Sequence, residues 1–524
     1  MFSRAYSAQT NLLKGQLITI EVDLSKGLNA FSIVGLADKA VEESKDRVGS
    51  ALKNSGYESP KHKNQKTVVS LSPANIKKEG SYFDTAIALA YLLSTEELKF
   101  NPEKKIFLGE LSLNGELREI KGTLALAQEA KRLGFEELYV PIENAKEAAL
   151  IDGITVFGVA TLRDLIEHLR PAPKNAVDRT KKFTLLPQNK TPIDYRSRVF
   201  ETDFCDIKGQ ETAKRGLEIA AAGGHNIAMY GPPGTGKTML ARAFAGILPH
   251  LSLSEVLEVT GIHSVAGTLT EDLITHPPFR APHHSASYVS MIGGGTFPKP
   301  GEVTLAHRGV LFLDEFPEFE KRVIESLRQP LEDNVVSISR AKGSAVFPSN
   351  FILVASMNLC PCGNSGSKHP SAQAGKVCIC RPNDLARYQR KLSGPIMDRI
   401  DMWVSVGAVD LQKLSDENNT SESSLSIRKR VREARLIQSE RFKTHTRPLR
   451  SNSDMNTKDI SVFAPLDEAT KKALQESAAR LNLSARSYHR VIKLARTIAD
   501  LSGSAEIRLS HIMEALQYRP KNLL

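Results

Sequence analysis

The sequence lacks any run of about 18 apolar residues, the length that a helix needs to cross a bilayer. The first residues, Met1–Tyr6, also lack the apolar stretch of a secretion signal. Cysteine is scarce, with five residues in 524, and all but one lie between Cys360 and Cys380. This distribution differs from the disulfide framework of a secreted protein. We therefore expect a cytoplasmic protein with no membrane segment.

The overall composition is that of an ordinary globular protein, with 41% hydrophobic and 25% charged residues. A chain of 524 residues is long enough for about three domains. The formal net charge of +11 and the isoelectric point near 9.2 favour an anionic partner such as nucleic acid. Surplus charge spread over this length also serves solubility, so charge alone does not identify the partner.

The strongest motif is a glycine-rich loop between an apolar run, residues 226–230, and a helical run, residues 239–245. It has the pattern G-x-x-x-x-G-K-T, whose glycines let backbone N–H groups surround a phosphate chain at a helix N-terminus. Lys237 is placed to reach the β- and γ-phosphates of ATP, and Thr238 to hold Mg²⁺. The strand–loop–helix context disfavours the alternative, a coincidental turn. The residues predicted to bind ATP here are Gly231, Pro232, Pro233, Gly234, Thr235, Gly236, Lys237, Thr238 and Met239.

Two further apolar runs end in polar residues. Residues 310–313 precede Asp314 and Glu315, a pattern typical of a buried strand that delivers carboxylates at its carboxyl end. Asp314 is predicted to help hold Mg²⁺, and Glu315 to polarise the attacking water. Residues 350–355 lead to Asn358, whose side chain is placed to contact the γ-phosphate or the water. An N-cap or turn asparagine is the alternative.

Three longer motifs resemble the magnesium-chelatase-like branch of the AAA+ ATPases: residues 279–284 (FRAPHH), 292–295 (IGGG) and 300–315 (PGEVTLAHRGVLFLDE). Over nearly its whole length the chain resembles the ComM/YifB family within this branch. The resemblance implies a ring-shaped hexameric motor with helicase and branch-migration activity during the integration of incoming DNA in natural transformation. Single-stranded or branched DNA is therefore the expected partner.

The resemblance also implies roles for three residues outside these motifs. Arg399 matches the arginine finger, which completes the ATP site of a neighbouring subunit, and Arg486 matches the second sensor arginine. Ile207 matches the apolar residue that lies against the adenine. The alternatives are a structural arginine paired with Asp398 or Asp401 in the first case and a helix-surface arginine in the second. The predicted catalytic set is Glu315, Lys237, Asn358, Arg399 and Arg486.

The first 170 residues have the pattern of an α/β unit. Residues 18–24 alternate between apolar and polar, as in a half-buried strand. KEGS (residues 78–81) precedes a helical pattern, a hairpin signal follows at Asn114-Gly115, and EIKG (residues 119–122) precedes a second helix. This order resembles the proteolytic domain of Lon-type proteases.

The Lon family uses a Ser–Lys dyad, and the two dyad positions fall here on Tyr82 and Leu124. Ser81 and Lys121 lie one and three positions away. The favoured interpretation is a Lon-like scaffold without peptidase chemistry, and a shifted dyad is the alternative.

The fold class predicted from these observations is α/β, in four parts. A Lon-protease-like (S5-like) α/β domain without an evident Ser–Lys dyad covers residues 1–170. Residues 171–198 are a linker, since prolines and polar residues occur there without a sustained period. Residues 199–410 form an AAA+ core with a parallel sheet, hairpin inserts and the cysteine pairs. Residues 411–524 form a small helical lid domain.

A basic hairpin is predicted at residues 333–349, where two alternating runs flank Arg340 and Lys342. Hairpins of this kind line the central pore in the branch that the chain resembles, so both residues are predicted to contact DNA. A second insert, from about residue 280, ends in Lys299. Phosphate contacts carry no sequence preference, which suits a sliding motor. A solvated basic turn is the alternative.

Two C-x-C pairs lie inside the predicted core and contain Cys360, Cys362, Cys378 and Cys380. Four thiolates from two close pairs make a closed tetrahedral Zn²⁺ site. The spacing is tighter than is usual for zinc ligands, and free thiols are the alternative. The fifth cysteine, Cys205, is expected to be a small buried residue.

The sequence thus predicts an AAA+ DNA motor that uses ATP and Mg²⁺, carries a structural Zn²⁺, and forms a homo-hexamer on nucleotide or DNA. One alternative function is a magnesium-chelatase-type metal insertase. The Lon-like N-terminal domain and the cysteine pairs argue against it. A second is a protein-remodelling machine, whose peptidase form the missing dyad disfavours. A third is a scaffold that binds ATP only to assemble, and the presence of both Asp314 and Glu315 argues against it.

Overall fold

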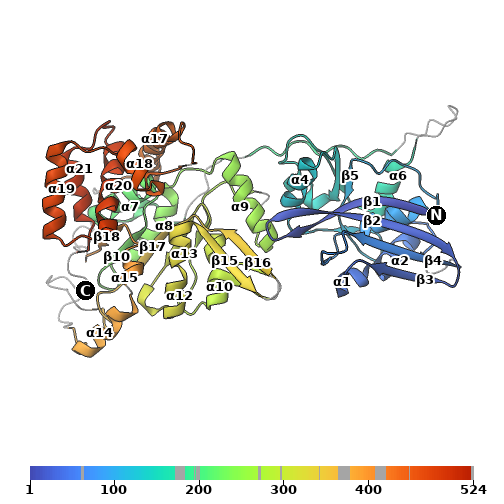
Figure 1. Cartoon of the computed structure of the whole chain (residues 1–524), viewed down its shortest axis with the longest axis horizontal. Coiled ribbons are helices and arrows are strands. Elements are labelled where there is room, and N and C mark those ends of the chain that lie inside the picture. The colour runs from blue at the N-terminus through green and yellow to red at the C-terminus, as the bar shows by residue number, and fades with distance from the viewer. Residues whose placement is uncertain are drawn as a thin grey trace. The chain divides into compact units, whose positions relative to one another are not determined.

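The computed structural model of the chain describes residues 1–60, 64–171, 183–193, 195, 201–269, 273–295, 298–340, 343–363, 378–392, 394–407, 421–447 and 449–520. The chain divides into two compact units, the first made of Met1–Asp194 and Leu253–Ile274 and the second of Tyr195–Ser252 and Thr275–Leu524 (Figure 1). The segment Leu253–Ile274 lies inside the range predicted for the ATPase core, yet it packs with the N-terminal unit.

The first unit is built on a mixed four-stranded sheet in the order β1–β2–β4–β3. Strands β1 and β2 form a long antiparallel hairpin, and only β3 runs parallel to its neighbour, β4. Ile18, Ile20 and Val22 on β2 are buried, as the period-two pattern predicts. The strands are β1 (Phe2–Asn11), β2 (Lys14–Lys26), β3 (Ala30–Val34) and β4 (Gln65–Ser72).

A parallel sheet in the order β5–β8–β9 and a short antiparallel pair, β6–β7, also belong to this unit. The pair β6–β7 is the hairpin predicted around Asn114-Gly115. The strands are β5 (Lys105–Phe107), β6 (Glu110–Leu111), β7 (Leu117–Arg118), β8 (Glu137–Pro141) and β9 (Thr155–Val159).

The helices of the first unit cover these sheets, and helix α3 is buried along nearly its whole length. Helix α9 comes from the distant segment and packs on α4, where the backbone N–H of Gly122 donates to the hydroxyl of Ser264 at 2.9 Å. The helices are α1 (Lys39–Glu42), α2 (Ser44–Asn54), α3 (Asp84–Ser94), α4 (Thr123–Arg132), α5 (Ala145–Ala148), α6 (Leu162–Leu169) and α9 (Leu253–Ala266), with the 3-10 turn η2 (Ile142–Asn144).

The second unit is organised around a five-stranded parallel sheet in the order β11–β14–β17–β10–β18. The three inner strands are apolar runs that the sequence predicted as buried. Neighbours in the sheet are distant in sequence, so each connection crosses over and all carboxyl ends meet at one edge. The strands are β10 (Ile227–Tyr230), β11 (Phe279–Arg280), β14 (Val310–Leu313), β17 (Ile352–Met357) and β18 (Met402–Ser405).

Helices and two small hairpins surround this sheet (Figure 1). The hairpin β15–β16 pairs Arg340 with Gly343, which confirms the hairpin predicted at residues 333–349. The remaining strands are β12 (Gly293–Gly294), β13 (Lys299–Pro300), β15 (Val335–Arg340) and β16 (Gly343–Pro348). The helices and 3-10 turns are η3 (Phe204–Asp206), α7 (Glu211–Gly223), α8 (Lys237–Ile247), α10 (Tyr288–Ile292), α11 (Glu302–Leu305), η4 (Phe316–Glu318), α12 (Lys321–Ser326), α13 (Arg328–Asp333), α14 (Pro382–Lys391) and α15 (Gly394–Met397).

The C-terminal part of the second unit is helical and shares one hydrophobic core with the sheet. Helix α17 packs on α7 and α8, and α20 packs on α7. Two arginines of α17 bind α7: Arg430 donates to Glu218 at 2.6 Å and Arg435 to the carbonyl of Ala221 at 2.8 Å. These elements are α17 (Ser424–Phe442), η5 (Asn452–Asp454), α18 (Thr457–Phe463), α19 (Glu468–Arg480), α20 (Ala485–Leu501) and α21 (Leu509–Gln517).

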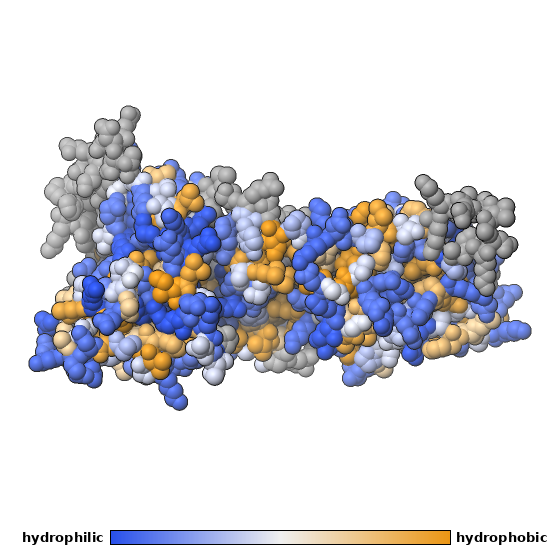
Figure 2. Space-filling view, turned by 90° about the horizontal axis from the view of Figure 1, so that it is seen from above, coloured by the Kyte–Doolittle hydropathy of each residue, from blue (hydrophilic) through white to orange (hydrophobic). Residues whose placement is uncertain are grey.

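The visible surface mixes residue types: in Figure 2, hydrophobic residues lie in small patches among hydrophilic ones. Among the described residues, no helix combines the length and the apolar character that crossing a bilayer requires.

Candidate functional site

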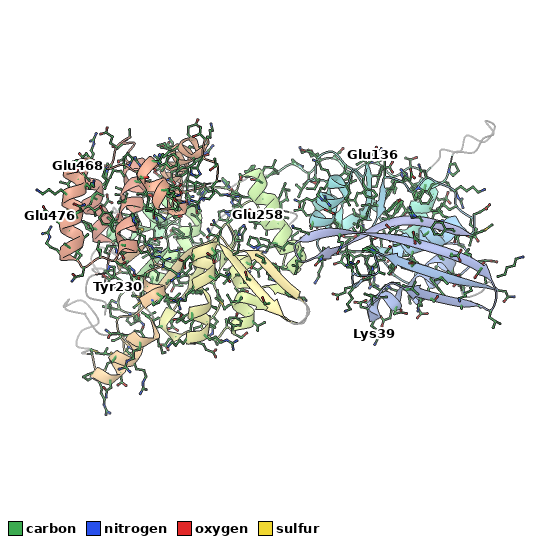
Figure 3. The ribbon with its side chains drawn as sticks, in the orientation of Figure 1. Lys39, Glu136, Tyr230, Glu258, Glu468 and Glu476 are labelled. Carbon is green, nitrogen blue, oxygen red and sulfur yellow. The ribbon has the colours of Figure 1, made fainter. Side chains whose placement is uncertain are left out.

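The glycine-rich loop joins the carboxyl end of β10 to the start of α8. Tyr230, labelled in Figure 3, is the last residue of β10. A Cβ atom at Gly231 would stand 2.0 Å from the carbonyl oxygen of Val406, so only glycine fits there. Gly236 is the N-cap of α8 with φ of 87°, a left-handed conformation that favours glycine. The loop thus presents its backbone and the positive end of α8 in the arrangement that phosphate-binding loops use.

Lys237, the first residue of α8, points into this loop and is only 9% exposed. Its ammonium donates to the carbonyl oxygens of Gly231 at 2.9 Å and Pro232 at 2.7 Å, and to Oδ1 of Asn358 at 3.2 Å. Burial lowers the pKa of Lys237, and the nearby Asp314 carboxylate acts in the opposite direction. The loop is therefore joined by a hydrogen bond to Asn358, the residue that follows β17.

Two acidic residues, Asp314 and Glu315, follow β14, and the carboxylate of Asp314 meets the end of the loop. The hydroxyl of Thr238 donates to Oδ2 of Asp314 at 2.8 Å, and the hydroxyl of Ser356 donates to Oδ1. The backbone N–H of Glu315 also donates to Oδ1, at 3.0 Å. Hydroxyl and carboxylate oxygens are ligands that Mg²⁺ prefers, so this donor set fits the predicted ion. Ser356 was not predicted as a site residue, although it lies at a strand end two residues before Asn358.

Glu315 adopts a left-handed backbone conformation with φ of 51°, which is uncommon outside glycine. Its Oε2 atom lies 3.2 Å from Nδ1 of His284, which follows the edge strand β11. The sequence marked residues 279–284 only as a family motif, because nothing local shows that β11 lies beside β14. Functional sites are where such strained conformations concentrate.

A cavity of about 690 Å³ opens at these carboxylates, a size that suits a small-molecule ligand. The side chain of Glu315 is 57% exposed and faces this space. The lining includes Thr238, Arg242, Phe279, His283, His284, Asp314 and Glu315.

The two arginines predicted from the family resemblance come together at a different place. Arg399 is 8% exposed, donates to the carbonyl of Pro395 at 2.7 Å, and forms an ion pair with Glu332. Arg486, at the start of α20, forms an ion pair with the other oxygen of Glu332. Partial burial acts to raise the pKa of Glu332, but the two guanidinium groups hold it below its ordinary value. Both arginines are described, and neither lines the cavity at Asp314.

The other predicted contact residues are scattered over the second unit. Ile207 is buried in its core, whereas Met239 is 46% exposed on the first turn of α8. Lys299 is exposed on β13, and Arg340 is the last residue of β15. Lys342 lies outside the described residues.

The four clustered cysteines do come together. The Sγ atoms of all four cysteines lie within 4.8 Å of one another. These cysteines are Cys360, Cys362, Cys378 and Cys380. Cys205 was expected to be buried, and this prediction is wrong. It lies on the one-turn helix η3 at the surface, exposed, with its thiol 3.8 Å from the carboxylate of Asp206.

In the first unit, the residues around the Lon dyad positions have other partners. The hydroxyl of Ser81 donates to the carboxylate of Glu110. Leu124 is fully buried on α4, and Tyr82 is partly buried, which raises the pKa of its phenol. The side chain of Lys121 lies against the turn that follows α9. Ser81 therefore has a carboxylate, rather than an ammonium, at its hydroxyl.

The phosphate loop after β10, the carboxylates after β14 and the polar end of β17 lie on adjacent strands of one parallel sheet, followed by a helical C-terminal part. This combination defines a P-loop ATPase of the AAA+ class. Family models agree, and those that match are described as magnesium chelatase, subunit ChlI (residues 203–414), subunit ChlI of Mg-chelatase (residues 20–144) and magnesium chelatase, subunit ChlI C-terminal (residues 421–519).

Full-length relatives define the family more narrowly. The chain is 39% identical over 521 residues to the competence protein ComM of Haemophilus influenzae, covering 98% of this chain and 96% of the relative. It is 40% identical over 504 residues to the Escherichia coli protein called uncharacterized protein YifB, covering 96% and 94%. The chain belongs to the ComM/YifB family of magnesium-chelatase-like AAA+ ATPases.

Lon protease 2 of Bacillus subtilis is 30% identical over 184 residues, 31% of this chain and 33% of that protein. This similarity, the parallel sheet and the helical C-terminal part confirm the predicted fold class, which combines Lon-like homology with an AAA+ core.

Proposed function

We propose that this ATPase is a DNA motor, a helicase that drives branch migration and promotes the integration of incoming DNA during natural transformation. The observation that carries the ATP-hydrolysing part is the hydrogen-bonded set at the carboxyl edge of the sheet, where Lys237, Thr238 and Asp314 meet. The DNA part is supported by the name of the competence protein ComM, which this chain matches over 98% of its length, and by the net charge of +11.

Each residue of the site has a specific task in this proposal. Lys237 binds the β- and γ-phosphates, while Thr238 and Asp314 hold the Mg²⁺ that neutralises charge developing on the transferred phosphoryl group. Glu315 orients and polarises the attacking water from the cavity edge. Asn358, joined to Lys237 at 3.2 Å, detects the γ-phosphate. The backbone of the loop and the side chains of Ile207 and Met239 complete the contacts with the nucleotide.

Arg399 acts as the arginine finger on the ATP site of a neighbouring subunit. Arg399 does not line the cavity beside its own Asp314, as a finger that serves a neighbouring site requires. Arg486, which shares the partner Glu332 with Arg399, is the second sensor arginine. Catalysis then depends on assembly, which we propose is a homo-hexamer formed on nucleotide or DNA.

Positive residues of the hairpin inserts make the DNA contacts in this proposal. Lys299 is exposed on β13, Arg340 is the last residue of β15, and Lys342 follows two positions later in the sequence. They bind phosphates without reading bases, which a translocating motor requires. We also propose that residues 1–170 form a Lon-like domain without peptidase activity. The four clustered cysteines bind a structural Zn²⁺ in this proposal.

The test is the Mg²⁺-dependent ATPase rate with and without single-stranded and branched DNA. We expect DNA to stimulate turnover severalfold, and the double substitution Arg340→Ala with Lys342→Ala to remove most of the stimulation while basal turnover stays. Lys472→Ala, an exposed lysine on α19, is the matched control. An assembled ring with basal activity and no response to any DNA would overturn the motor proposal.

Subunit mixing tests the assembly. Glu315→Gln and Arg399→Ala subunits are each expected to be inactive alone. A mixture is expected to regain part of the activity, because some interfaces then combine an intact Glu315 with an intact Arg399 from the neighbour. A mixed ring of the expected mass that recovers no ATPase activity would contradict the action of Arg399 on a neighbouring subunit.

A metal insertase is the second candidate, because the family models that match carry magnesium chelatase descriptions. It predicts that a porphyrin, rather than DNA, raises the ATPase rate. Testing both ligands in the same assay separates the two functions.

A further inference from the structure

The four cysteine thiols are spaced as ligands of one soft metal ion. The Sγ–Sγ distances are 3.3 Å for Cys360 and Cys362, 3.6 Å for Cys362 and Cys378, and 3.8 Å for Cys378 and Cys360. Thiolates that bind Zn²⁺ at about 2.3 Å lie about 3.8 Å apart at the corners of a tetrahedron. A disulfide would need about 2.05 Å. With Cys380, whose Sγ atom lies within 4.8 Å of the other three, the cluster fits one tetrahedral ion.

The first cysteine pair is attached directly to the end of β17. Cys360 is fully buried and lies two residues after Asn358. Residues 358–363, all of them described, lie outside the helices and strands. A hydrogen bond of 3.0 Å from the N–H of Gly363 to the carbonyl of Cys360 closes the turn. The position of Asn358 therefore depends on what holds these cysteines.

The second pair is attached to α14, which returns to the same turn. Cys380 lies two residues before the first residue of α14. The phenol of Tyr388 on α14 donates to the backbone carbonyl of Asn358 at 3.0 Å. Lys391, the last residue of the helix, forms an ion pair of 2.8 Å with Glu318 on η4, the turn that follows the catalytic candidate Glu315.

The turn also touches the phosphate loop. A Cβ atom at Gly363 would stand only 2.8 Å from Cδ of Pro233 in that loop. Asn358 meets the same loop through Lys237, at 3.2 Å. One short segment therefore connects the cysteine cluster to two residues of the phosphate loop, the cation Lys237 and the ring of Pro233.

We propose that the four cysteines bind one Zn²⁺ whose role is to position Asn358 and to support the phosphate loop, with Tyr388 as the second anchor of the turn. The inference rests on the proposed ATPase function, since it assigns the metal a task in that site. The ion crosslinks the turn after β17 to the start of α14 and performs no chemistry. Zn²⁺ suits this task because it is redox-inert and binds four thiolates in a closed site.

Metal content is the first measurement. The full-length protein, purified without chelator or a metal column, is expected to contain close to one zinc and no iron per chain by elemental analysis. Cys360→Ser and Cys378→Ser are expected to lose the zinc, and Cys205→Ser, which changes the exposed cysteine outside the cluster, to keep it. Wild-type protein with full ATPase activity and no bound zinc would overturn the inference and leave the ATPase proposal standing.

Reversible removal of the ion tests its role without relying on variants that fold poorly. Titration of the thiols with a mercurial is expected to release zinc and lower ATP turnover about tenfold, and reducing agent plus Zn²⁺ to restore both. Unchanged turnover after complete release would overturn the positioning role.

Tyr388→Phe removes only the hydroxyl bond to Asn358, so it separates positioning from metal binding. It is expected to keep one zinc and to lower kcat severalfold with little change in ATP affinity. Full kcat in this variant would contradict the second anchor. A protein that binds one zinc per chain but never hydrolyses ATP would overturn the proposed function while the metal assignment stands.

Discussion

Both units consist of sheets covered by helices, but the positions at which chemistry is predicted carry different side chains in the two units. In the second unit, three adjacent parallel strands bring Lys237, Asp314 and Asn358 to one edge, and hydrogen bonds join this set to its neighbours. In the first unit, the positions predicted to match the Lon dyad hold Tyr82, which precedes α3, and Leu124 on α4, and these side chains are partly and fully buried. We therefore expect chemistry where polar side chains converge, rather than wherever a scaffold resembles that of an enzyme.

The largest expected effect comes from removing the cation of the phosphate loop. Lys237→Ala should abolish detectable ATP binding and lower ATP turnover at least 100-fold, about 2.7 kcal/mol or more, because the ammonium inside the loop is lost. A fluorescent ATP analogue and a phosphate-release assay measure the two effects. Lys321→Ala, an exposed lysine on α12, is the control. ATP binding and ATP turnover near the wild-type values in Lys237→Ala would contradict the assignment of ATP hydrolysis to the second unit.

A smaller effect is expected at His284, which holds the carboxylate of Glu315 at 3.2 Å. His284→Ala should lower kcat about tenfold with little change in KM for ATP, about 1.4 kcal/mol in the barrier, because the water-activating group loses its fixed position. Lys321→Ala, which changes an exposed lysine outside the lining of the cavity, is the control. A kcat for His284→Ala equal to that of this control would contradict the positioning role of His284.

The next prediction concerns stability in the second unit. Burial acts to raise the pKa of Asp401, but the positive charge of Arg490 at 3.2 Å and the imidazole of His225 at 3.8 Å hold it well below the ordinary range. Asp401→Asn should lower the free energy of unfolding by about 3 kcal/mol near pH 7. Trp403, the single tryptophan, is buried two residues away and reports the transition by its fluorescence.

The pH dependence of this difference follows from the lowered pKa of Asp401. The stabilisation is fully present above the unfolded pKa of about 3.9 and is lost as the pH falls through the lower folded value. The gap between wild type and variant should therefore stay constant from pH 7 to 5 and shrink below pH 4. Asp152→Asn, which removes an exposed ion pair with Lys190, should change stability by less than about 1 kcal/mol. A gap that grows on acidification would contradict the assignment.

The smallest effect is expected in the first unit. Ser81→Ala should leave ATP turnover unchanged. Neither the wild type nor this variant should cleave peptides, because the hydroxyl of Ser81 is hydrogen-bonded to the carboxylate of Glu110. Casein digestion and the phosphate-release assay, run on the same preparation, measure both. Peptide cleavage by wild type that disappears in Ser81→Ala would show a shifted dyad and break the contrast between the units.

Local sequence patterns predicted the strands of the nucleotide site well. Residues 310–313 and 350–355 are apolar runs with polar residues at their ends, and they form β14 and most of β17. The alternation in residues 18–24 lies within β2, and the basic hairpin is β15–β16. These elements were predictable because burial of one face imposes a period of two on a strand, and burial of both faces imposes a continuous apolar run.

What the sequence did not predict depends on contacts between distant segments. No local pattern shows that His284 meets Glu315, that Glu332 binds both Arg399 and Arg486, or that α9 packs on α4. Each requires the order of strands or the packing of helices, which periodicity does not encode. Cys205 was predicted as buried from residue type alone, and its place on a surface turn overrides that tendency.

The central claim is that the carboxyl edge of the five-stranded sheet hydrolyses ATP with Glu315 as the group that activates water. The most direct measurement compares ATP affinity and single-turnover hydrolysis for wild type and Glu315→Gln, with Mg²⁺ present. We expect Glu315→Gln to bind ATP with an affinity within about threefold of wild type and to hydrolyse it at least 100-fold more slowly. Hydrolysis at the wild-type rate by Glu315→Gln would contradict it.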